Sequence, residues 1–141
     1  MAPLDAEVVQ RKLEHLRELL QMLEAEAGAT AAEFLADRRQ QLVVERLLHL
    51  LVETACDLLQ HLLVQEHGQR PQSFADCFLQ AGQRGLISSE LAMELAPAAG
   101  LRNRLVHDYE RLDPQRIHAA MGTALTQMAQ LLDELTARMG I

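Results

Sequence analysis

The segment from Arg38 to His67 constrains the fold of this chain more than any other stretch of its sequence. Asp37 can cap the start of a helix there and Gly68 can end it, which predicts the longest helix of the protein. A helix with two apolar faces packs inside its bundle through one of them and against another surface through the second. We expect that second surface to be a homodimer interface. The apolar residues that cover more than one stripe of this helix are Leu42, Val43, Leu47, Leu48, Leu50, Leu51, Val52, Ala55, Leu58, Leu59, Leu62 and Leu63.

An amphipathic helix is predicted before this segment. Asp5, which follows Pro3, is a suitable N-cap, and Gly28 stops the helix. Apolar residues recur between them in steps of three and four, so one face of this helix is expected to be buried in a bundle. These residues are Val9, Leu13, Leu16, Leu20 and Leu23.

Capping and breaking residues mark shorter helices on both sides of the long segment. The pattern at Thr30–Glu33 is a capping box and predicts a short helical turn. Ser73 can cap a helix that runs through Ala81. Gly82 and Gly85 are expected to break that helix.

Two further helices are predicted towards the end of the chain. Ser88 or Ser89 starts the first, and Pro97 with Gly100 is expected to end or kink it. The pair Asp113–Pro114 opens the second, because Asp is a good cap and Pro suits the first helical position. The apolar stripe of this last helix consists of Ile117, Met121, Leu125, Met128, Leu131, Leu132 and Leu135.

Composition agrees with an all-α fold. The chain has 141 residues, of which 49% are hydrophobic, with only 7 Gly and 4 Pro. No repeat or linker interrupts the helical patterns, so we expect one domain over residues 1–141. The predicted architecture is a single antiparallel helical bundle of four to five main helices, assembled as a two-fold dimer.

Charge and aromatic content exclude some functions. A net charge of −7 argues against broad electrostatic binding to nucleic acid, and 3% aromatic residues without Trp provide no series of stacking platforms. Cys56 and Cys77 belong to no CxxC pattern, which indicates buried free thiols in a reducing compartment. Without a signal-peptide pattern or a membrane-spanning run, we expect a cytoplasmic protein. Positive charge gathers locally at Arg102, Arg104, Arg111 and Arg116, although Asp108, Glu110 and Asp113 offset much of it.

The residues suited to chemistry concentrate in the stretch 101–109, Leu-Arg-Asn-Arg-Leu-Val-His-Asp-Tyr. On a helix, Arg102 and His107 would fall within one broad face, so both could point into one cleft. An arginine suits a phosphate, and an imidazole can carry a proton near neutral pH. Alternatively, these cations only complement the C-terminal dipole of a helix that ends near Tyr109.

A row of polar residues repeats every four positions along the long predicted helix. We call it the polar row: Glu45, His49, Glu53, Asp57 and His61. Such spacing can bind metal, with Asp57 and His61 as ligands. It is more often found on a solvated or interface-lining face, and we assign no metal site or cofactor to it.

The stretch 101–109 resembles the R-x4-H-x-Y signature of the HEPN superfamily, and specifically its HepT-like toxins. Arg102, His107 and Tyr109 match the signature, and Asn103 is the polar residue often seen after the arginine. The polar row also resembles that of HepT-like proteins, which makes Asp57 a plausible partner of the motif. The resemblance covers almost the whole chain.

The resemblance implies a toxin that is a metal-independent endoribonuclease, acting on tRNA or other cellular RNA at a cleft shared by two protomers. It assigns acid/base chemistry to His107 and phosphate stabilisation to Arg102, with Asn103 orienting the substrate or the partner motif. Arg104 either contacts the substrate or faces solvent. It also implies a nucleotidyltransferase antitoxin that attaches AMP to Tyr109. A non-catalytic helical module that binds a nucleotidyltransferase or a nucleotide is the alternative, and Tyr109 would then simply pack at a helix end.

Overall fold

The computed structural model describes residues 3–140, with side chains from Ala6 onward, and all regular secondary structure in that range is helical. The predicted all-α bundle is therefore confirmed. The elements in chain order are α1 (Pro3–Glu26), α2 (Ala31–Leu35), α3 (Arg38–His67), α4 (Phe74–Gln83), α5 (Ser89–His107), the 3-10 helix η1 (Tyr109–Arg111) and α6 (Pro114–Met139).

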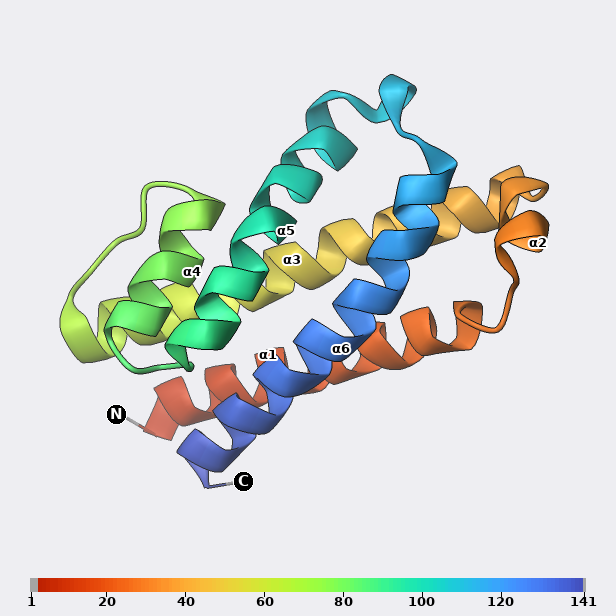
Figure 1. Cartoon of the computed structure of the whole chain (residues 1–141). Helices are drawn as coiled ribbons and strands as arrows, with labels where there is room; N and C mark the ends of the chain where they lie inside the picture. The colour runs from red at the N-terminus through yellow and green to blue at the C-terminus, as the bar shows by residue number, and fades with distance from the viewer. Residues whose placement is uncertain (1–2, 141) are drawn as a thin grey trace.

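The long helix α3 is the centre of the bundle and packs against every other α-helix (Figure 1). It runs antiparallel to α1, while α4, α5 and α6 cover its other sides. Its leucines from Leu47 to Leu63 are buried except for the partly buried Leu50. By length and composition alone α3 could also span a membrane, but 61% of its most apolar window is buried inside the protein.

The second apolar face of α3 is thus largely covered within one chain and gives no evidence for a dimer interface, so the homodimer stays a prediction. The reason for this coverage is topological, because five helices surround α3 instead of the three that a simple bundle would provide. Only Leu42 and Val43, near its start, remain exposed at 50% and 38%.

Most predicted helix caps are confirmed by their hydrogen bonds. The Asp37 side chain accepts from the Gln40 backbone at 3.1 Å, and Gly68 ends α3 with a φ of 64°. The Thr30–Glu33 capping box is complete, and its hydrogen bonds to Thr30 lower the pKa of the Glu33 carboxyl. The remaining confirmed N-caps are Ser73, Ser88 and Asp113.

Three predicted boundaries were wrong. Helix α1 begins at Pro3, so Asp5 lies inside the helix; proline suits a first helical position because its missing N–H needs no partner there. Helix α5 does not end at Pro97 or Gly100, which is the part of that expectation that was wrong; both residues are exposed, so packing of the opposite face holds the helix together. The motif therefore lies on one continuous helix.

The third wrong boundary is Gly82, which lies inside α4. A Cβ placed there would come within 2.5 Å of the Ala92 Cβ on α5. The glycine thus permits close packing of α4 against α5 and does not end the helix. The break that was expected nearby occurs at Gly85, which has a φ of 73°.

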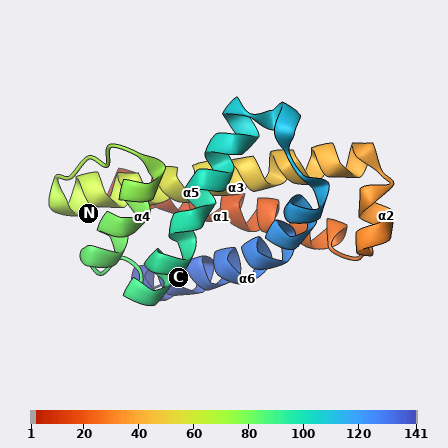
Figure 2. The same cartoon turned by 45° about the horizontal axis from the view of Figure 1, so that its top comes forward.

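The end of α5, η1 and the start of α6 extend beyond the rest of the bundle. Figure 2 shows this corner in turquoise and blue, projecting above α3. Because the stretch 101–109 spans this corner, the fold places the candidate motif where a second molecule can reach it.

Candidate functional site

The motif occupies the last turns of α5 and the first residue of η1. Arg102 to His107 are helical, Asp108 is the C-cap, and the Asp108 backbone N–H donates to the Arg104 carbonyl at 2.9 Å. Arg104 and His107 fall in the last turn, where cations complement the helix dipole. The capping interpretation and the functional one are therefore compatible.

Arg102 is held in a cradle built by three helices. Its Nε donates to Glu53 Oε1 on α3 at 3.1 Å, and its Nη2 donates to the same oxygen. Its guanidinium carbon lies 4.3 Å from the centroid of the Phe74 ring on α4, a cation–π contact. The side chain is only 17% exposed, so the charge is fixed in place and largely shielded from water.

His49 of the polar row and the nearby Arg46 extend this cradle. His49 Nε2 lies 2.9 Å from Glu53 Oε1, and Arg46 Nη1 lies 3.1 Å from His49 Nδ1. Since arginine can only donate, Nδ1 accepts and Nε2 donates to the carboxylate. The pKa of Glu53 is lowered chiefly by its hydrogen bond from Arg102, against the opposing effect of burial.

His107 and Asn103 lie on another side of α5. They are four residues apart, both are exposed, and Tyr109 beyond them is 60% exposed. Within the described residues no hydrogen bond links His107 to Arg102. The expectation that both residues point into one cleft therefore stays a prediction: five residues turn the helix through about 500°, so the two side chains leave it in different directions and a shared cleft requires further groups around them.

Asp57 does not contact the motif, contrary to the sequence-based expectation. It is exposed and lines a shallow hollow with His61, Lys12 and Arg70. The carboxylate that contacts Arg102 is Glu53, one helical turn earlier. Over the part of the chain that the structure describes, no group of three or more His, Cys, Asp and Glu side chains could hold a metal ion.

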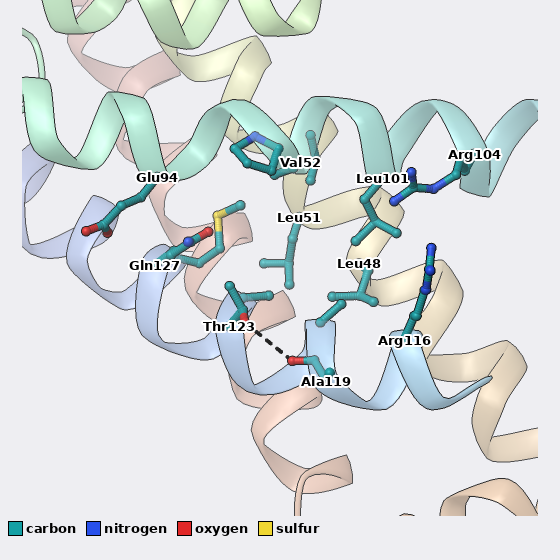
Figure 3. Close-up of a pocket in the computed structure, with 15 residues that line it drawn as sticks. Leu48, Leu51, Val52, Glu94, Leu101, Arg104, Arg116, Ala119, Thr123 and Gln127 are labelled. Atoms are coloured by element: carbon teal, nitrogen blue, oxygen red, sulfur yellow. Dashed lines mark hydrogen bonds between the residues drawn. The ribbon is translucent and has the colours of Figure 1, made fainter. Parts of the chain in front are cut away.

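An apolar groove between α3, α5 and α6 flanks the motif on the opposite side of α5 from Arg102. Its volume is about 360 Å³, and Leu48, Leu51 and Val52 line it from α3. Figure 3 shows Arg104 and Arg116 together at one end of the groove and Glu94 at the other. Arg104 is thus separated from Arg102 although they are two residues apart.

Comparison with known proteins assigns a family. The sequence model of the HepT-like ribonucleases matches residues 9–135. The chain belongs to the HepT-like ribonuclease family. A tRNA nuclease HepT from Aphanizomenon flos-aquae is 32% identical over 127 residues, which cover 90% of this chain and 86% of that protein. An mRNA nuclease HepT from Shewanella oneidensis is 32% identical over 85 residues, 60% of this chain and 64% of that one.

Solved structures agree with this assignment. A tri-AMPylated Shewanella oneidensis HEPN toxin in complex with an MNT antitoxin superimposes with a TM-score of 0.84 at 26% identity, covering 97% of this chain and 99% of that one. A toxin–antitoxin complex with AMP-PNP also gives a TM-score of 0.84, at 25% identity and with 93% and 98% coverage.

Sequence reasoning missed two residues of the site in this HepT-like chain. Glu53 belongs to the polar row but had no assigned role, and Phe74 was covered only by the helix predicted to follow Ser73. The spacing of His49 and Glu53 by one turn indicated that they interact. No local signal pairs Glu53 with Arg102, which is 49 residues away along the chain.

The two cysteines are free and buried, as predicted. Cys77 Sγ lies 3.5 Å from the Cys56 carbonyl oxygen, and burial raises the pKa of the Cys56 thiol. Both thiols are buried, so neither cysteine is assigned to the candidate site of this HepT-like protein.

Proposed function

We propose that this protein is the toxin of a toxin–antitoxin pair and a metal-independent endoribonuclease of the HepT-like type, acting in the cytoplasm on tRNA or another cellular RNA. The proposal rests on the side chains at the end of α5, where the fixed guanidinium of Arg102 and the accessible imidazole of His107 both belong to the family motif. Similarity to a tRNA nuclease over 90% of the chain supports it.

Metal-independent RNA cleavage requires more catalytic groups than a single chain supplies. RNA cleavage without metal needs a base for the 2′-hydroxyl proton, an acid for the leaving 5′-oxygen, and positive charge on the phosphate. One protomer offers His107 for proton transfer and Arg102 for charge, on different sides of α5. A two-fold dimer that joins two motif corners would bring together two histidines and two arginines in one composite cleft.

Each motif residue then has a distinct role. His107 acts as acid or base, because it is exposed at the projecting corner. Arg102 stabilises the pentacoordinate phosphate, and Asn103, one turn before His107, orients the substrate. Arg104 contacts a more distant phosphate, since it is exposed and lies with Arg116 at the end of the groove.

Tyr109 is the proposed site of regulation. Its ring is 60% exposed, so a nucleotidyltransferase antitoxin can reach its hydroxyl. The hydroxyl oxygen attacks the α-phosphate of ATP, pyrophosphate leaves, and AMP remains attached to the tyrosine. The added negative phosphate, two residues from His107, competes with RNA for Arg102 and obstructs the cleft.

The second candidate function is a non-catalytic module that binds a nucleotidyltransferase or a nucleotide. The ion pair between Glu53 and Arg102 favours it, because a guanidinium already paired with a carboxylate attracts a phosphate less strongly. The net charge of −7 favours it too.

The decisive experiment is cleavage of total tRNA by purified, unmodified protein in the presence of a chelator. We compare wild type with His107→Ala, Arg102→Ala and the matched control His15→Ala, which removes an exposed histidine from α1. Cleavage by wild type and the control but not by the motif variants, at unchanged helical content, supports the ribonuclease. Equal cleavage by all four proteins contradicts the assignment of His107 and Arg102 to the active site. Absence of cleavage by wild type favours the non-catalytic module that binds a nucleotidyltransferase or a nucleotide.

A further inference from the structure

We propose that Glu53 is a positioning residue for Arg102, which it holds in the orientation that receives the scissile phosphate. This inference rests on the proposed ribonuclease function and assigns a role to a residue outside the signature motif. Glu53 comes from the middle of the central helix α3, whereas Arg102 lies near the end of α5, so their contact fixes one helix against the other.

The hydrogen bonds leave one edge of the guanidinium free. Nε and Nη2 both donate to Glu53 Oε1, and Nη1 makes only a long contact of 3.5 Å with Asn103 Oδ1. An N–H on each terminal nitrogen therefore remains for a phosphate, which arginine can bind through two parallel hydrogen bonds. The carboxylate and a phosphate can consequently occupy different edges of Arg102 at the same time.

The surroundings restrict the movement of both partners. The Phe74 ring lies against the Arg102 guanidinium at 4.3 Å, which limits tilting of its plane. His49 donates to the same Glu53 oxygen at 2.9 Å, and Arg46 fixes the imidazole that does so. A long side chain that is free loses rotamer entropy when it binds, whereas one already held in place loses less.

Removal of the Glu53 carboxylate should therefore slow the chemical step and not chiefly weaken substrate binding. For Glu53→Ala we expect kcat to fall roughly 10- to 100-fold with KM changed less than about threefold, because a small displacement of a catalytic group is costly. Glu53→Gln keeps an acceptor oxygen and should recover part of the loss. A kcat equal to or above wild type in Glu53→Ala, with unchanged helical content, would overturn the proposal and make Glu53 a competitor of the phosphate.

The matched control is Glu66→Ala. Glu66 also lies on α3 and pairs with an arginine of another helix, Arg138 of α6, but that pair belongs to the far end of α3. If loss of any interhelical ion pair from α3 slowed the enzyme, this variant would be slow too. We expect its kcat to stay within about twofold of wild type.

A second measurement does not depend on activity. In 15N-resolved NMR spectra, the Nε–H proton of Arg102 should exchange slowly with water in wild type and in Glu66→Ala, and rapidly in Glu53→Ala. Its resonance is identified by its loss in Arg102→Lys. Slow exchange that persists in Glu53→Ala would refute the positioning role. A protein that cleaves no RNA yet shows the expected exchange would refute the proposed function and leave the placement of Arg102 by Glu53 intact.

Discussion

At the residue scale, Arg102 illustrates how a charge is kept largely buried in a small bundle. Removing a guanidinium from water is costly unless a carboxylate and well-directed hydrogen bonds replace the lost solvation. Glu53 provides both, and Phe74 adds the face of an aromatic ring. The same contacts that make burial possible also fix the geometry of the cation.

Glu53→Gln should lower stability in a pH-dependent way. The pKa of Glu53 is lowered from 4.5 in the folded protein, so its stabilisation is full above that value and is lost as pH falls through the folded pKa. Because Glu53 is 34% exposed, solvent screens the pair, and we expect a loss of about 1 kcal/mol near neutral pH.

Urea unfolding of wild type and Glu53→Gln, at the same protein concentration and at a series of pH values, measures this difference in the free energy of unfolding. The gap in the free energy of unfolding between wild type and Glu53→Gln should narrow as pH falls below the ordinary range of a glutamate. A gap that stays constant down to about pH 3 would show that the charge of Glu53 does not stabilise the fold.

Tyr109→Phe should abolish modification without abolishing cleavage. The ring is 60% exposed, so loss of the hydroxyl should change stability by less than about 0.5 kcal/mol. After incubation with ATP and the cognate nucleotidyltransferase, mass spectrometry should find AMP on wild type only. The variant should then still cleave RNA whereas the modified wild type should not. AMP on the variant would place the modification elsewhere.

At the element scale, packing overrides local signals. Gly82, Pro97 and Gly100 are all residues that break helices in isolation, yet α4 and α5 continue through them. The gain from burying Leu91, Leu95 and other residues of these helices exceeds the local cost. As a result the motif arginine lies on the same rigid helix that is anchored against α4.

Gly82→Ala should destabilise the protein by about 1–3 kcal/mol, although alanine is the better helix former. The added methyl group would come within 2.5 Å of the Ala92 Cβ and push α4 away from α5. Gly122→Ala is the control, because no heavy atom lies within 4 Å of a Cβ on this exposed glycine of α6. It should stabilise by about 0.5–1 kcal/mol. Thermal unfolding should move the two variants in opposite directions, and a shift in the same direction would contradict the packing argument.

At the scale of the whole molecule, the proposed metal-free cleavage requires more catalytic groups than one motif provides. Arg102 contacts Glu53 of α3 and Phe74 of α4, whereas His107 is exposed at the end of α5. The net charge of −7 also disfavours broad electrostatic binding of RNA over the whole surface. Both features favour local recognition in a cleft between two protomers.

Subunit mixing tests the composite cleft. Wild type and His107→Ala chains are unfolded together, refolded at different ratios and assayed for RNA cleavage. If both histidines of a dimer are required, activity should fall as the square of the wild-type fraction, because only dimers of two wild-type chains are active. A linear fall would show that each chain carries a complete site, and the dimer mass measured by light scattering serves as the control for assembly.

The sequence by itself determined the helices and the motif. Asp37 and Gly68 bound α3, and Asp113 with Pro114 opens α6, because caps and left-handed glycines act through neighbouring backbone groups. The spacing of Arg102, His107 and Tyr109 indicated the family, which the match over residues 9–135 confirmed. These are local properties, and local sequence is sufficient for them.

Only the tertiary structure decided which side chains meet. It paired Arg102 with Glu53 and not with Asp57, because the crossing of α5 over α3 selects one turn of the polar row. It also buried most of the second apolar face of α3 within one chain. The physical reason is that contacts between residues far apart in sequence depend on how whole helices pack, and no spacing within a single helix encodes that arrangement.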